Sequence, residues 1–574
     1  MQLLSGNEAI ALGAFHGGAR IGLGYPGTPS TETLEYFARL EDVKAEWCTN
    51  EKVALEVAIG ASAAGERSLV TMKHVGLNVA ADPLFTSAYT GVNGGLVILV
   101  ADDPGMYSSQ NEQDSHYYAQ AAHVPMIDPA DSQEAYDFAR IAYALSEEFD
   151  VPFLLRSEVR ISHTRTLVKE GEAADPVEHP YEKEPQKWVM MPAFAKPRRI
   201  DQIKRMERLR QWSDESPLNR VEIRSEDIGI ICAGATYQYV RDALPEASVL
   251  KLGITYPLPE TKVREFARAV SQVYVIEEAS TYLTDAVRAL GVTLADPSHP
   301  IPLAGELSPN LIRLSFGIPL PDHASTDEAA PARPPSLCAG CPHRIVFKEL
   351  SRMRAIVTGD IGCYTLGALP PLAAMDTCVD MGASVSMAHG FELGLAGKEH
   401  PPVVAVIGDS TFAHSGLSSL ITTVYNKGAG IVGILDNRTT AMTGRQGNPF
   451  NGVALQGDEA KELDIEGVVR AIGVEDVRVV DPNDLDAVRS AFKDARADEQ
   501  TLSVIIFKRP CVLLDRHVEP PYFVSSCTGC GVCITLGCPA IGKDPESGLA
   551  YIDQTSCIGC GQCAQYCRFN AITR

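Results

Sequence analysis

Short runs of aliphatic residues alternate along this chain with Ala-rich stretches that have helical spacing. The runs Gly95–Val100 and Pro402–Ile407 are apolar almost throughout, which is typical of parallel strands buried on both faces. Strands that alternate with helices in this way predict an α/β fold with doubly wound parallel sheets. Each apolar run is much shorter than the roughly 18 residues of a membrane-spanning helix, so we expect no membrane span.

Breaks in this alternation divide the chain into several parts. Residues 166–222 are rich in Glu, Lys, Pro and Arg and include a charged helical stretch, Gln202–Trp212, so we predict a connector at the surface. The Pro-containing range 323–336 is predicted to be a linker, and residues 518–574 form a cysteine-rich tail. We predict α/β domains for the three ranges that keep the alternation, which are 1–165, 223–322 and 337–515.

The length and net charge of the chain limit the kinds of protein that it can be. The chain has 574 residues and a formal net charge of -23. That length is enough for about three to five domains with substantial cores, and the acidic balance disfavours nucleic acid as a partner. Residues Met1–Gly6 lack a basic stretch with an apolar one behind it. We therefore expect no signal peptide and a cytoplasmic protein whose thiols stay reduced.

The tail holds eight of the chain's 15 cysteines, in two groups with nearly the same spacing. Each group has three cysteines separated by two residues and a fourth at a distance. In two-cluster ferredoxins that fourth cysteine ligates the other cluster. Zinc, which usually takes paired C-x2-4-C units, and disulfides are the alternatives. We predict two 4Fe-4S clusters with the ligand sets Cys527, Cys530, Cys533, Cys567 and Cys538, Cys557, Cys560, Cys563.

A second pattern of polar residues lies in the third predicted domain. Gly408-Asp409-Ser410 follows one predicted strand and Asp436-Asn437 follows the next, so that Asn437 comes 28 residues after Asp409. The carboxyl ends of parallel strands meet at one edge of a sheet, where such sheets bind ligands. A carboxylate and an amide oxygen suit Mg²⁺, and the helix start after Gly408 favours an anion. This is the signature of a thiamine diphosphate site, with Ser410 where Gly is usual; a surface loop with incidental acids is the alternative.

Two glycine-rich turns upstream, Gly359–Thr365 and Met381–Ser384, follow short predicted strands. Glycine lets the backbone come close to a cofactor, so both turns are candidates for the same site, with ordinary turns as the alternative. The candidate residues are Gly362, Cys363, Met381, Gly382 and Ser384.

With these motifs, the chain resembles 2-oxoacid:ferredoxin oxidoreductases, and among them the large subunits of the indolepyruvate class. The resemblance covers nearly the whole chain, tail included. It implies that residues 1–165 bind the thiamine pyrimidine and residues 337–515 the diphosphate, and that the range between them resembles the C-terminal domain of transketolases. The motifs are Tyr25–Ser30, Asn50–Val53, Met72–Asn78, Leu337–Arg344, Gly359–Cys363 and Leu435–Gly444.

The resemblance also implies roles for single residues. Glu51 aligns with the glutamate that hydrogen-bonds the pyrimidine ring and promotes proton transfer at the thiazolium, as a general acid-base group does; Glu56 is the alternative on the same helix. Thr28 would face the substrate carbonyl and the cofactor. Lys73 and His74 are candidates to bind the substrate carboxylate, although a surface Lys and a packed His fit as well. Two further positions at the diphosphate are Thr439, through its carbonyl to Mg²⁺, and Met442.

A dinucleotide site is an alternative for part of the same region. Gly22–Gly27 fits G-x-G-x-x-G, and Glu46 lies about 20 residues further on, where a ribose-binding acid is expected. The motif is short and common, and the resemblance accounts for the same residues without a dinucleotide.

Four cysteines outside the tail match a further feature of the resembled family. Relatives carry a 4Fe-4S cluster near thiamine, and the positions of its ligands have counterparts here in Cys338, Cys341, Cys363 and Cys511. The alternatives are buried apolar cysteines or a zinc half-site at the C-x2-C pair.

The resemblance implies oxidative decarboxylation of an arylpyruvate to an aryl-acetyl-CoA and CO₂, with single electrons passing through clusters to an external ferredoxin. It also implies a separate small subunit in an α2β2 assembly. A non-oxidative thiamine decarboxylase or carboligase is one alternative, and the tail cysteines argue against it. An electron-transfer subunit with an inert thiamine fold is another, and Asp409, Asn437 and Glu51 argue against that. The preferred aryl group, the CoA site and the physiological direction stay open.

Overall fold

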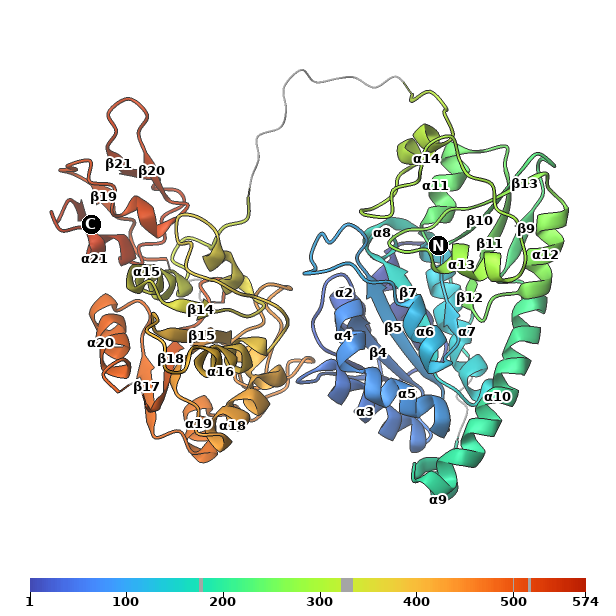
Figure 1. Ribbon diagram of the computed structural model, residues 1–574, viewed down its shortest axis with the longest axis horizontal. Coiled ribbons are helices and arrows are strands. Elements are labelled where there is room, and N and C mark those ends of the chain that lie inside the picture. Colours follow the sequence, from blue (N-terminus) through green and yellow to red (C-terminus); the bar gives the residue numbers. More distant parts are fainter. Residues whose placement is uncertain (175–178, 322–333, 499, 515–517) are drawn as a thin grey trace. The chain divides into compact units, whose positions relative to one another are not determined.

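The computed structural model describes residues 1–174, 179–321, 334–498, 500–514 and 518–574. The chain divides into two compact units, Met1–Ser325 and Thr326–Arg574, and both are built from helices and mostly parallel sheets (Figure 1). The predicted linker 323–336 lies, apart from its end, outside the described residues. In the described part of the chain, no helix is both long and apolar enough to cross a bilayer.

The main sheet of the first unit has seven strands in the order β12-β6-β7-β5-β4-β2-β3. All neighbours are parallel except β12, which pairs antiparallel with β6. Every residue of β4, β5 and β7 is buried, as expected for parallel strands covered by helices on both faces. The strands are β2 Ile21–Gly24, β3 Lys44–Trp47, β4 Ser68–Lys73, β5 Leu96–Asp102, β6 Met126–Ile127, β7 Phe153–Glu158 and β12 Ile254–Tyr256.

Helices in the first 165 residues surround this sheet, and a small antiparallel pair joins β1 (Gln2–Ser5) to β8 (Arg165–Val168). The helix α1 begins with a capping box between Ser5 and Glu8 and packs along α7. The helices are α1 Gly6–His16, α2 Thr31–Phe37, α3 Glu51–Ala63, α4 His74–Val79, α5 Ala81–Thr90, α6 His116–Ala122, α7 Ser132–Phe149 and α8 Val159–His163.

A second sheet of the first unit has four strands in the order β13-β10-β11-β9, with β9 antiparallel. Strand β12 comes from the same part of the sequence but lies in the main sheet, so the two sheets share one stretch of chain. Buried Lys251 on β11 also pairs with Glu134 on α7. The elements are β9 Arg220–Glu222, β10 Ile228–Ala233, α11 Thr236–Ala243, β11 Ser248–Leu252, α12 Glu260–Arg268, β13 Gln272–Val275, α13 Tyr282–Ala289 and α14 Pro309–Ser315.

The predicted connector contains α9 (Pro185–Trp188) and a long helix, α10 (Pro192–Glu215). The charged helical stretch expected at Gln202–Trp212 is thus part of a helix that begins ten residues earlier. One side of α10 is not at the surface, since Arg205, Met206 and Leu209 are buried. Arg205 and Arg198 both pair with Asp150 at the end of α7, which holds the helix against the first domain.

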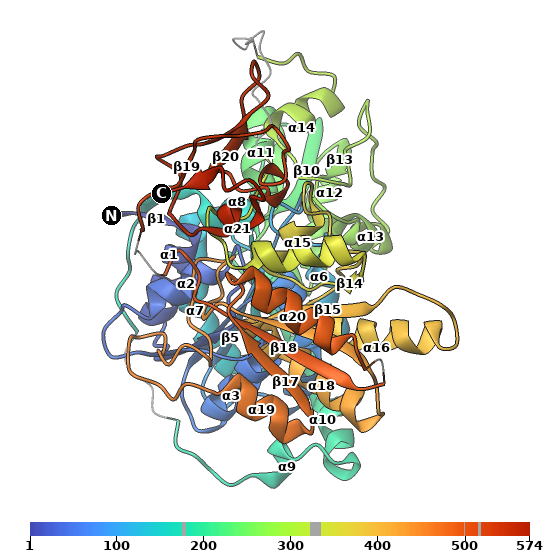
Figure 2. The same ribbon diagram turned by 90° about the vertical axis from the view of Figure 1, so that its left-hand side faces the viewer.

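The second unit is built on a parallel five-stranded sheet, β14-β15-β16-β18-β17. Alternate residues of its strands form two cores, one with α15 and α20 and one with α16, α18 and α19, and α15 and α20 lie in front of the sheet in Figure 2. The elements are α15 His343–Met353, β14 Ile356–Thr358, α16 Ala383–Leu395, β15 Val403–Gly408, α17 Asp409–Thr411, α18 Leu417–Tyr425, β16 Gly430–Asp436, α19 Ile465–Ile472, β17 Asp476–Val480, α20 Leu485–Ala495 and β18 Leu502–Lys508.

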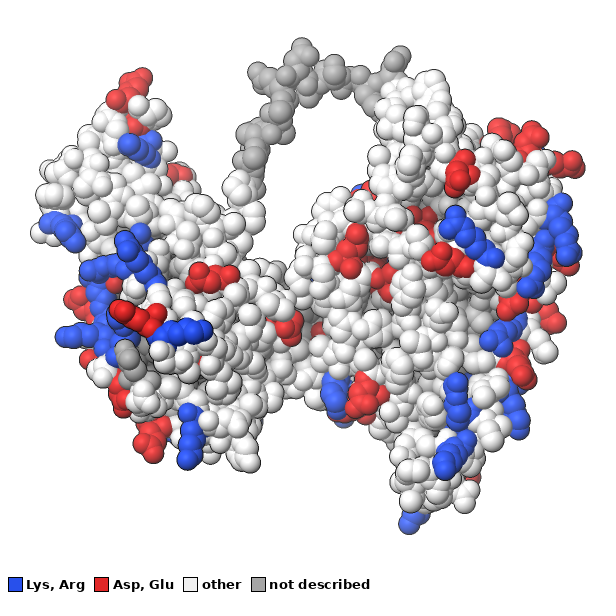
Figure 3. Space-filling view, viewed as in Figure 1, with Lys and Arg blue, Asp and Glu red and all other residues white. Residues whose placement is uncertain are grey.

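The cysteine-rich tail packs directly on this sheet domain and shares a core with it. Buried Leu536, Cys563 and Tyr566 belong to the same hydrophobic cluster as α15 and α20, and the Tyr566 hydroxyl donates to Glu349 at 2.7 Å. The tail elements are β19 Phe523–Val524, β20 Ile541–Lys543, β21 Ala550–Ile552, α21 Gln562–Tyr566 and β22 Ile572–Thr573. On the face drawn in Figure 3, acidic and basic side chains are interspersed in both units.

Candidate active site

Asp409 and Asn437 follow neighbouring parallel strands, β15 and β16, and both are buried. The two carboxylate oxygens of Asp409 accept from the backbone N–H groups of Ser410 at 2.7 Å and Arg438 at 2.8 Å. Since Arg438 follows Asn437 directly, this second bond ties the two predicted cation ligands together. Helix begins at Asp409 itself, because α17 and a π-helical turn precede α18.

The electrostatics of this edge suit a cation. Burial, followed by the nearby Asp436 carboxylate, raises the pKa of Asp409 to about 7. A bound divalent ion would favour the carboxylate and offset that cost. Thr439 is buried beside Asn437, to whose side-chain oxygen its N–H donates at 3.2 Å. Ser410 accepts from the Thr440 hydroxyl at 2.9 Å, while Met442 is half exposed.

The two glycine-rich turns meet at Asp360, a residue to which the sequence interpretation assigned no role. Its carboxylate accepts from the N–H groups of Gly382 at 2.8 Å and Ser384 at 3.0 Å, so it joins the turn after β14 to the N-terminus of α16. A Cβ on Gly382, whose φ is +90°, would collide with Ser415 in the turn after β15. The predicted turns therefore lie together at the edge that carries Asp409. The signal for Asp360 was its position, directly after a short strand and a glycine.

The four cysteines outside the tail with family counterparts all belong to the second unit. Burial, then Cys511 and Cys338, raise the pKa of Cys363 to about 11. Burial likewise raises the pKa of Cys341 to about 12, with Cys338 and Cys363 contributing. Burial and Cys338 raise the pKa of Cys511. Cys363 follows β14 and Cys511 follows β18 of the same sheet, and the N–H of Cys341 donates to the Cys338 carbonyl at 3.1 Å. That the four form one ligand group stays a prediction.

This cysteine group is joined to the cation edge through the backbone. The N–H of Cys511 donates to the carbonyl oxygen of Asn437 at 2.9 Å. His343, two residues after Cys341, lies 3.4 Å from the Asn437 side-chain nitrogen through its Nε2. Burial lowers the pKa of His343 to about 4, so its ring is neutral near pH 7 and can accept from that amide. These contacts fix the orientation of Asn437, as hydrogen-bond partners of metal-binding residues commonly do.

The two ligand sets expected in the tail stay a prediction, and the surroundings of their cysteines are compatible with it. Burial raises the pKa of Cys533, with contributions from Cys527, Cys530 and Cys567. Burial raises the pKa of Cys563 to about 12, with contributions from Cys560, Cys538, Cys557 and, more weakly, Cys533. The second group also lines one small apolar cavity. Among the described residues no His, Cys, Asp or Glu set is arranged around a single metal ion; a cubane differs, because each thiolate binds its own iron.

In the first unit, the predicted substrate residues gather at the carboxyl ends of β2, β4 and β5. Lys73, the last residue of β4, is buried, and its ammonium donates to the Ser108 carbonyl at 2.5 Å. The Ser108 hydroxyl donates to the Thr28 carbonyl at 3.3 Å. His74 Nε2 lies 3.2 Å from the Ser109 hydroxyl. Burial lowers the pKa of Lys73 to about 8, which Asp103 partly offsets.

Glu51 is buried at the start of α3, whose N-cap is Asn50. A Cβ added to Gly76 in α4 would touch the Glu51 carboxylate, so the acid lies against the helix that begins at His74. Glu56 is exposed instead and pairs with Lys52. The glycines of the G-x-G-x-x-G match have packing roles, since a Cβ at Gly22 would collide with Phe37 on α2.

Three family descriptions match separate parts of the chain. Residues 12–220 match the thiamine diphosphate-binding region of pyruvate flavodoxin/ferredoxin oxidoreductases, and residues 360–507 match the C-terminal thiamine pyrophosphate-binding domain of thiamine pyrophosphate enzymes. Residues 550–573 match a 4Fe-4S binding domain. The first two matches contain Glu51 and Asp409 respectively.

Similar proteins extend along the entire chain. Indolepyruvate oxidoreductase subunit IorA of Pyrococcus horikoshii is 38% identical over 100% of this chain and 96% of its own length. The subunit of the same name from Methanothermobacter marburgensis is 40% identical over 99% of this chain and 96% of its own length. The chain belongs to the indolepyruvate oxidoreductase IorA family. The resemblance noted in the sequence is confirmed, and the identical positions extend through both units of this IorA family member.

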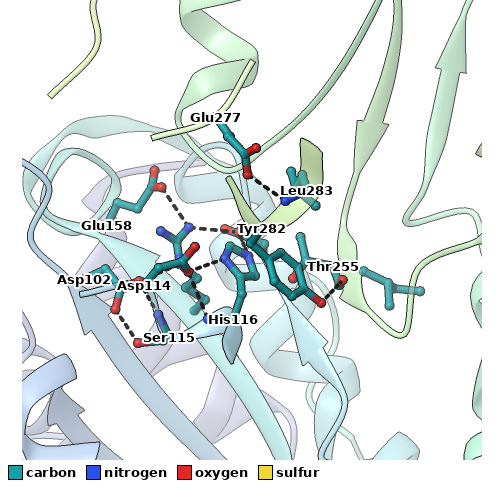
Figure 4. Close-up of polar contacts among 12 residues, drawn as sticks. Asp102, Asp114, Ser115, His116, Glu158, Thr255, Glu277, Tyr282 and Leu283 are labelled. Atoms are coloured by element: carbon teal, nitrogen blue, oxygen red, sulfur yellow. Dashed lines mark hydrogen bonds and ion pairs between the residues drawn. The ribbon is translucent and has the colours of Figure 1, made fainter. Parts of the chain in front are cut away.

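The first unit of this IorA family member also contains a buried ion network between its two sheets (Figure 4). Arg156 on β7 pairs with Asp102 at 2.7 Å, Glu158 at 2.8 Å and Asp128 at 3.0 Å. His116 pairs with Asp114 at 2.5 Å. Two contacts extend the network to the second sheet: the Ser280 hydroxyl donates to Asp114, and the rings of His116 and Tyr282 stack with centroids 4.7 Å apart.

This network predicts that the first unit is less stable at alkaline pH. Burial opposes the charge on His116, but Asp114 raises its pKa to about 9. Burial and Glu158 raise the pKa of Glu278 to about 8. Both groups bind protons more tightly in the folded state, so stability is lost as pH rises through these values. Calorimetry should show the melting temperature falling by several degrees between pH 6.5 and 9, and falling less in His116→Gln. A melting temperature that is constant over this range would contradict the assignment.

Proposed function

We propose that this chain is the large subunit of a thiamine-dependent indolepyruvate:ferredoxin oxidoreductase. In this function an arylpyruvate is oxidatively decarboxylated to an aryl-acetyl-CoA and CO₂, and the electrons leave one at a time to ferredoxin. One observation carries the proposal: the cation edge of Asp409 and Asn437 is bonded to the four-cysteine group through Cys511. A thiamine enzyme that transfers no electrons does not need cysteines next to its cation site. An enzyme that oxidises a thiamine-bound carbon does, because the electrons must leave from there.

Each half of the thiamine diphosphate site has residues suited to it. Bound thiamine diphosphate supplies the nucleophilic carbon and the electron sink for decarboxylation. Asp409 and the side-chain oxygen of Asn437, with the Thr439 carbonyl, would hold Mg²⁺ on the diphosphate. The surrounding turns would contact the cofactor through Gly362, Cys363, Met381, Gly382, Ser384, Gly408, Ser410 and Met442.

The first unit would supply the acid-base and substrate groups. Glu51 would hold a proton at the pyrimidine nitrogen and pass it during activation of the cofactor. Lys73 and His74 would bind the substrate carboxylate, since the buried ammonium lies at the Ser108 carbonyl and the imidazole lies at the Ser109 hydroxyl. Thr28 would face the substrate carbonyl.

Three 4Fe-4S clusters would carry the electrons. A proximal cluster would use Cys338, Cys341, Cys363 and Cys511, and the two tail clusters would use the sets assigned above. The small cavity that Cys538, Cys557, Cys560 and Cys563 line together supports the second tail set. About twelve irons per chain are expected, against about eight if the tail alone is loaded.

The proposal also includes the subunit composition of the enzyme and the folds to which two parts of the chain correspond. Since the relatives are named as subunits, we expect a separate small subunit in an α2β2 enzyme, with CoA and ferredoxin as the other reactants. The four-stranded sheet of the first unit would correspond to the C-terminal domain of transketolases, and the tail to a two-cluster ferredoxin.

A substrate comparison tests the proposed activity. With the small subunit, ferredoxin and CoA present, kcat/KM for indolepyruvate and phenylpyruvate should exceed that for pyruvate by about tenfold or more, a difference that an aromatic pocket can supply. Equal or higher values with pyruvate would contradict the aryl assignment. Reduction of ferredoxin by none of the three acids would contradict the function itself.

The metal assignment has its own test. Asp409→Asn should weaken Mg²⁺-dependent binding of thiamine diphosphate by about 100-fold, because a ligand matters at least as much as the outer partners, whose loss costs 10- to 100-fold. Calorimetric titration of the cofactor measures this directly. Glu462→Gln is the matched control, since Glu462 is an exposed acid that pairs with Arg438 beside the same edge. Equal cofactor affinity in Asp409→Asn and the control would contradict the assignment.

A further inference from the structure

Arg344 is a buried cation between the sheet domain and the tail of the second unit. It lies in the first turn of α15, and its residue is 1% exposed. Its guanidinium donates to the backbone carbonyls of Leu536, Leu337 and Cys338, each at 2.8 Å. Among the described residues its Nε has no hydrogen-bond partner, and its other two nitrogens donate to carbonyls and not to a carboxylate. A buried charge without a counter-ion is costly, so an anion nearby is expected.

With the clusters bound, the anions near Arg344 would be cysteine thiolates of two different groups. In the proximal group, its guanidinium donates to the backbone carbonyl of Cys338 at 2.8 Å. It also lines the small apolar cavity that all four cysteines of the second tail group share, Cys538, Cys557, Cys560 and Cys563.

The two cysteine loops are in direct contact at this point. A Cβ on Gly340, between Cys338 and Cys341, would collide with Ile558 and would lie 3.4 Å from the Cβ of Cys560. Gln562 is buried beside them and donates to the carbonyl of Cys341 at 3.1 Å. Gly340 has a φ of +70°, a conformation that favours glycine, so the close approach is built into the loop.

We propose that Arg344 is a positioning residue that raises the reduction potentials of the proximal cluster and the Cys538/Cys557/Cys560/Cys563 cluster, and so makes the latter the entry point for electrons into the tail. This rests on the proposed function, which supplies the clusters. In the transfer, the proximal cluster loses one electron and the tail cluster gains it; no bond changes and no proton moves. The reduced form carries one more negative charge, which a buried cation stabilises, and charge and hydrogen bonding are known to set such potentials.

The same contacts indicate the cluster from which electrons leave the tail. Cys563 of the entry cluster and Cys533 of the other tail group are both buried in one hydrophobic core, so the second tail cluster comes next. Cys530 of that group is exposed. Electrons would therefore leave through the Cys527/Cys530/Cys533/Cys567 cluster, none of whose cysteines accepts a hydrogen bond from Arg344 in the described part of the chain.

The test is a redox titration of the holoenzyme followed by electron paramagnetic resonance. In Arg344→Gln, the equilibrium constant for one-electron reduction should fall at least tenfold, or 59 mV for one electron, at the two clusters that flank Arg344. The third cluster should change less than half as much on the millivolt scale. A structural role alone would not produce this selectivity. Unchanged potentials, or equal shifts at all three clusters, would overturn the proposal.

Two further variants separate charge from packing. Arg344→Lys keeps the charge and should keep both potentials near those of the parent; a tenfold change there would overturn the charge argument, and this variant serves if Arg344→Gln does not fold. Arg574→Gln is the matched control, because Arg574 also bonds the Cys557–Cys560 loop, at the Gly559 carbonyl, but is exposed. Water screens it, so its loss should shift the potentials less than Arg344→Gln; an equal shift would overturn the proposal.

Iron analysis of the parent keeps this proposal distinct from the proposed function. Twelve irons per chain with unshifted potentials in Arg344→Gln would reject the role of Arg344 alone. Eight irons would reject the proximal cluster, and the expected shift would then apply to the entry cluster of the tail, where its absence would still reject the role of Arg344.

Discussion

Replacing Glu51 with Gln is expected to lower indolepyruvate-dependent ferredoxin reduction by about 10²- to 10⁴-fold, the range that general acid-base groups contribute. The introduced amide would keep the size of the side chain and one hydrogen-bonding oxygen but could not hold or release the proton. The buried position of Glu51 against Gly76 leaves little room for water to replace it. The measurement is the steady-state rate with saturating thiamine diphosphate, CoA and the small subunit.

Glu56→Gln provides the control on the same helix. Glu56 is exposed and pairs with Lys52 four residues earlier, so its loss should change the rate by less than twofold, as for a surface ion pair. A normal rate in the Glu51 variant, with cofactor bound, would remove Glu51 from the catalytic group and favour an inert thiamine fold. A large loss in the Glu56 variant instead would exchange the two assignments.

The cation edge was predictable because it depends on local sequence order. A parallel strand that ends in Gly-Asp and a next strand that ends in Asp-Asn must place both polar ends at one edge of the sheet. Asp409 and Asn437 therefore needed no knowledge of distant contacts. The same holds for β5 and β15, whose continuous apolar runs correspond to strands that are buried along their whole length.

Long-range contacts were not predictable in this way. Strand β12 pairs with β6, which lies more than a hundred positions earlier in the chain, and its short sequence carries no sign of that partner. The buried face of α10 was hidden because its partners, such as Asp150, belong to another domain. Arg344 was part of a recognised motif, yet its contact with Leu536 in the tail is what gives it a role.

The proximal cysteines were predictable from the sequence only in part. Their positions matched the resembled family, but their convergence depends on three separate loops of the fold. Cys338 and Cys341 precede α15, Cys363 follows β14, and Cys511 follows β18. Because β14 and β18 lie in one parallel sheet, Cys363 and Cys511 reach the same edge as Asn437. This arrangement predicts that removal of Cys511 causes the largest loss of activity among the variants considered.

Cys511→Ala is expected to reduce 2-oxoacid-dependent ferredoxin reduction to the level seen without the 2-oxoacid. The substitution removes one thiolate of the proximal group but keeps the backbone N–H that donates to Asn437, so the cation edge should be undisturbed. Iron should fall from about twelve to about eight per chain. Thiamine diphosphate should still bind with parental affinity, and dithionite should still reduce the tail clusters.

Cys378→Ser is the matched control, and the comparison decides what the cysteine group does. Cys378 lies in the same domain, and its thiol contacts the Asp360 carbonyl at 3.5 Å, but it does not belong to the proximal group. Its substitution should leave iron content and rate close to the parent's. If Cys511→Ala retained twelve irons, the proximal assignment would be wrong. If it lost four irons yet still reduced ferredoxin at the parental rate, electrons would pass from thiamine to the tail without a proximal cluster, and the junction at Asn437 would be structural.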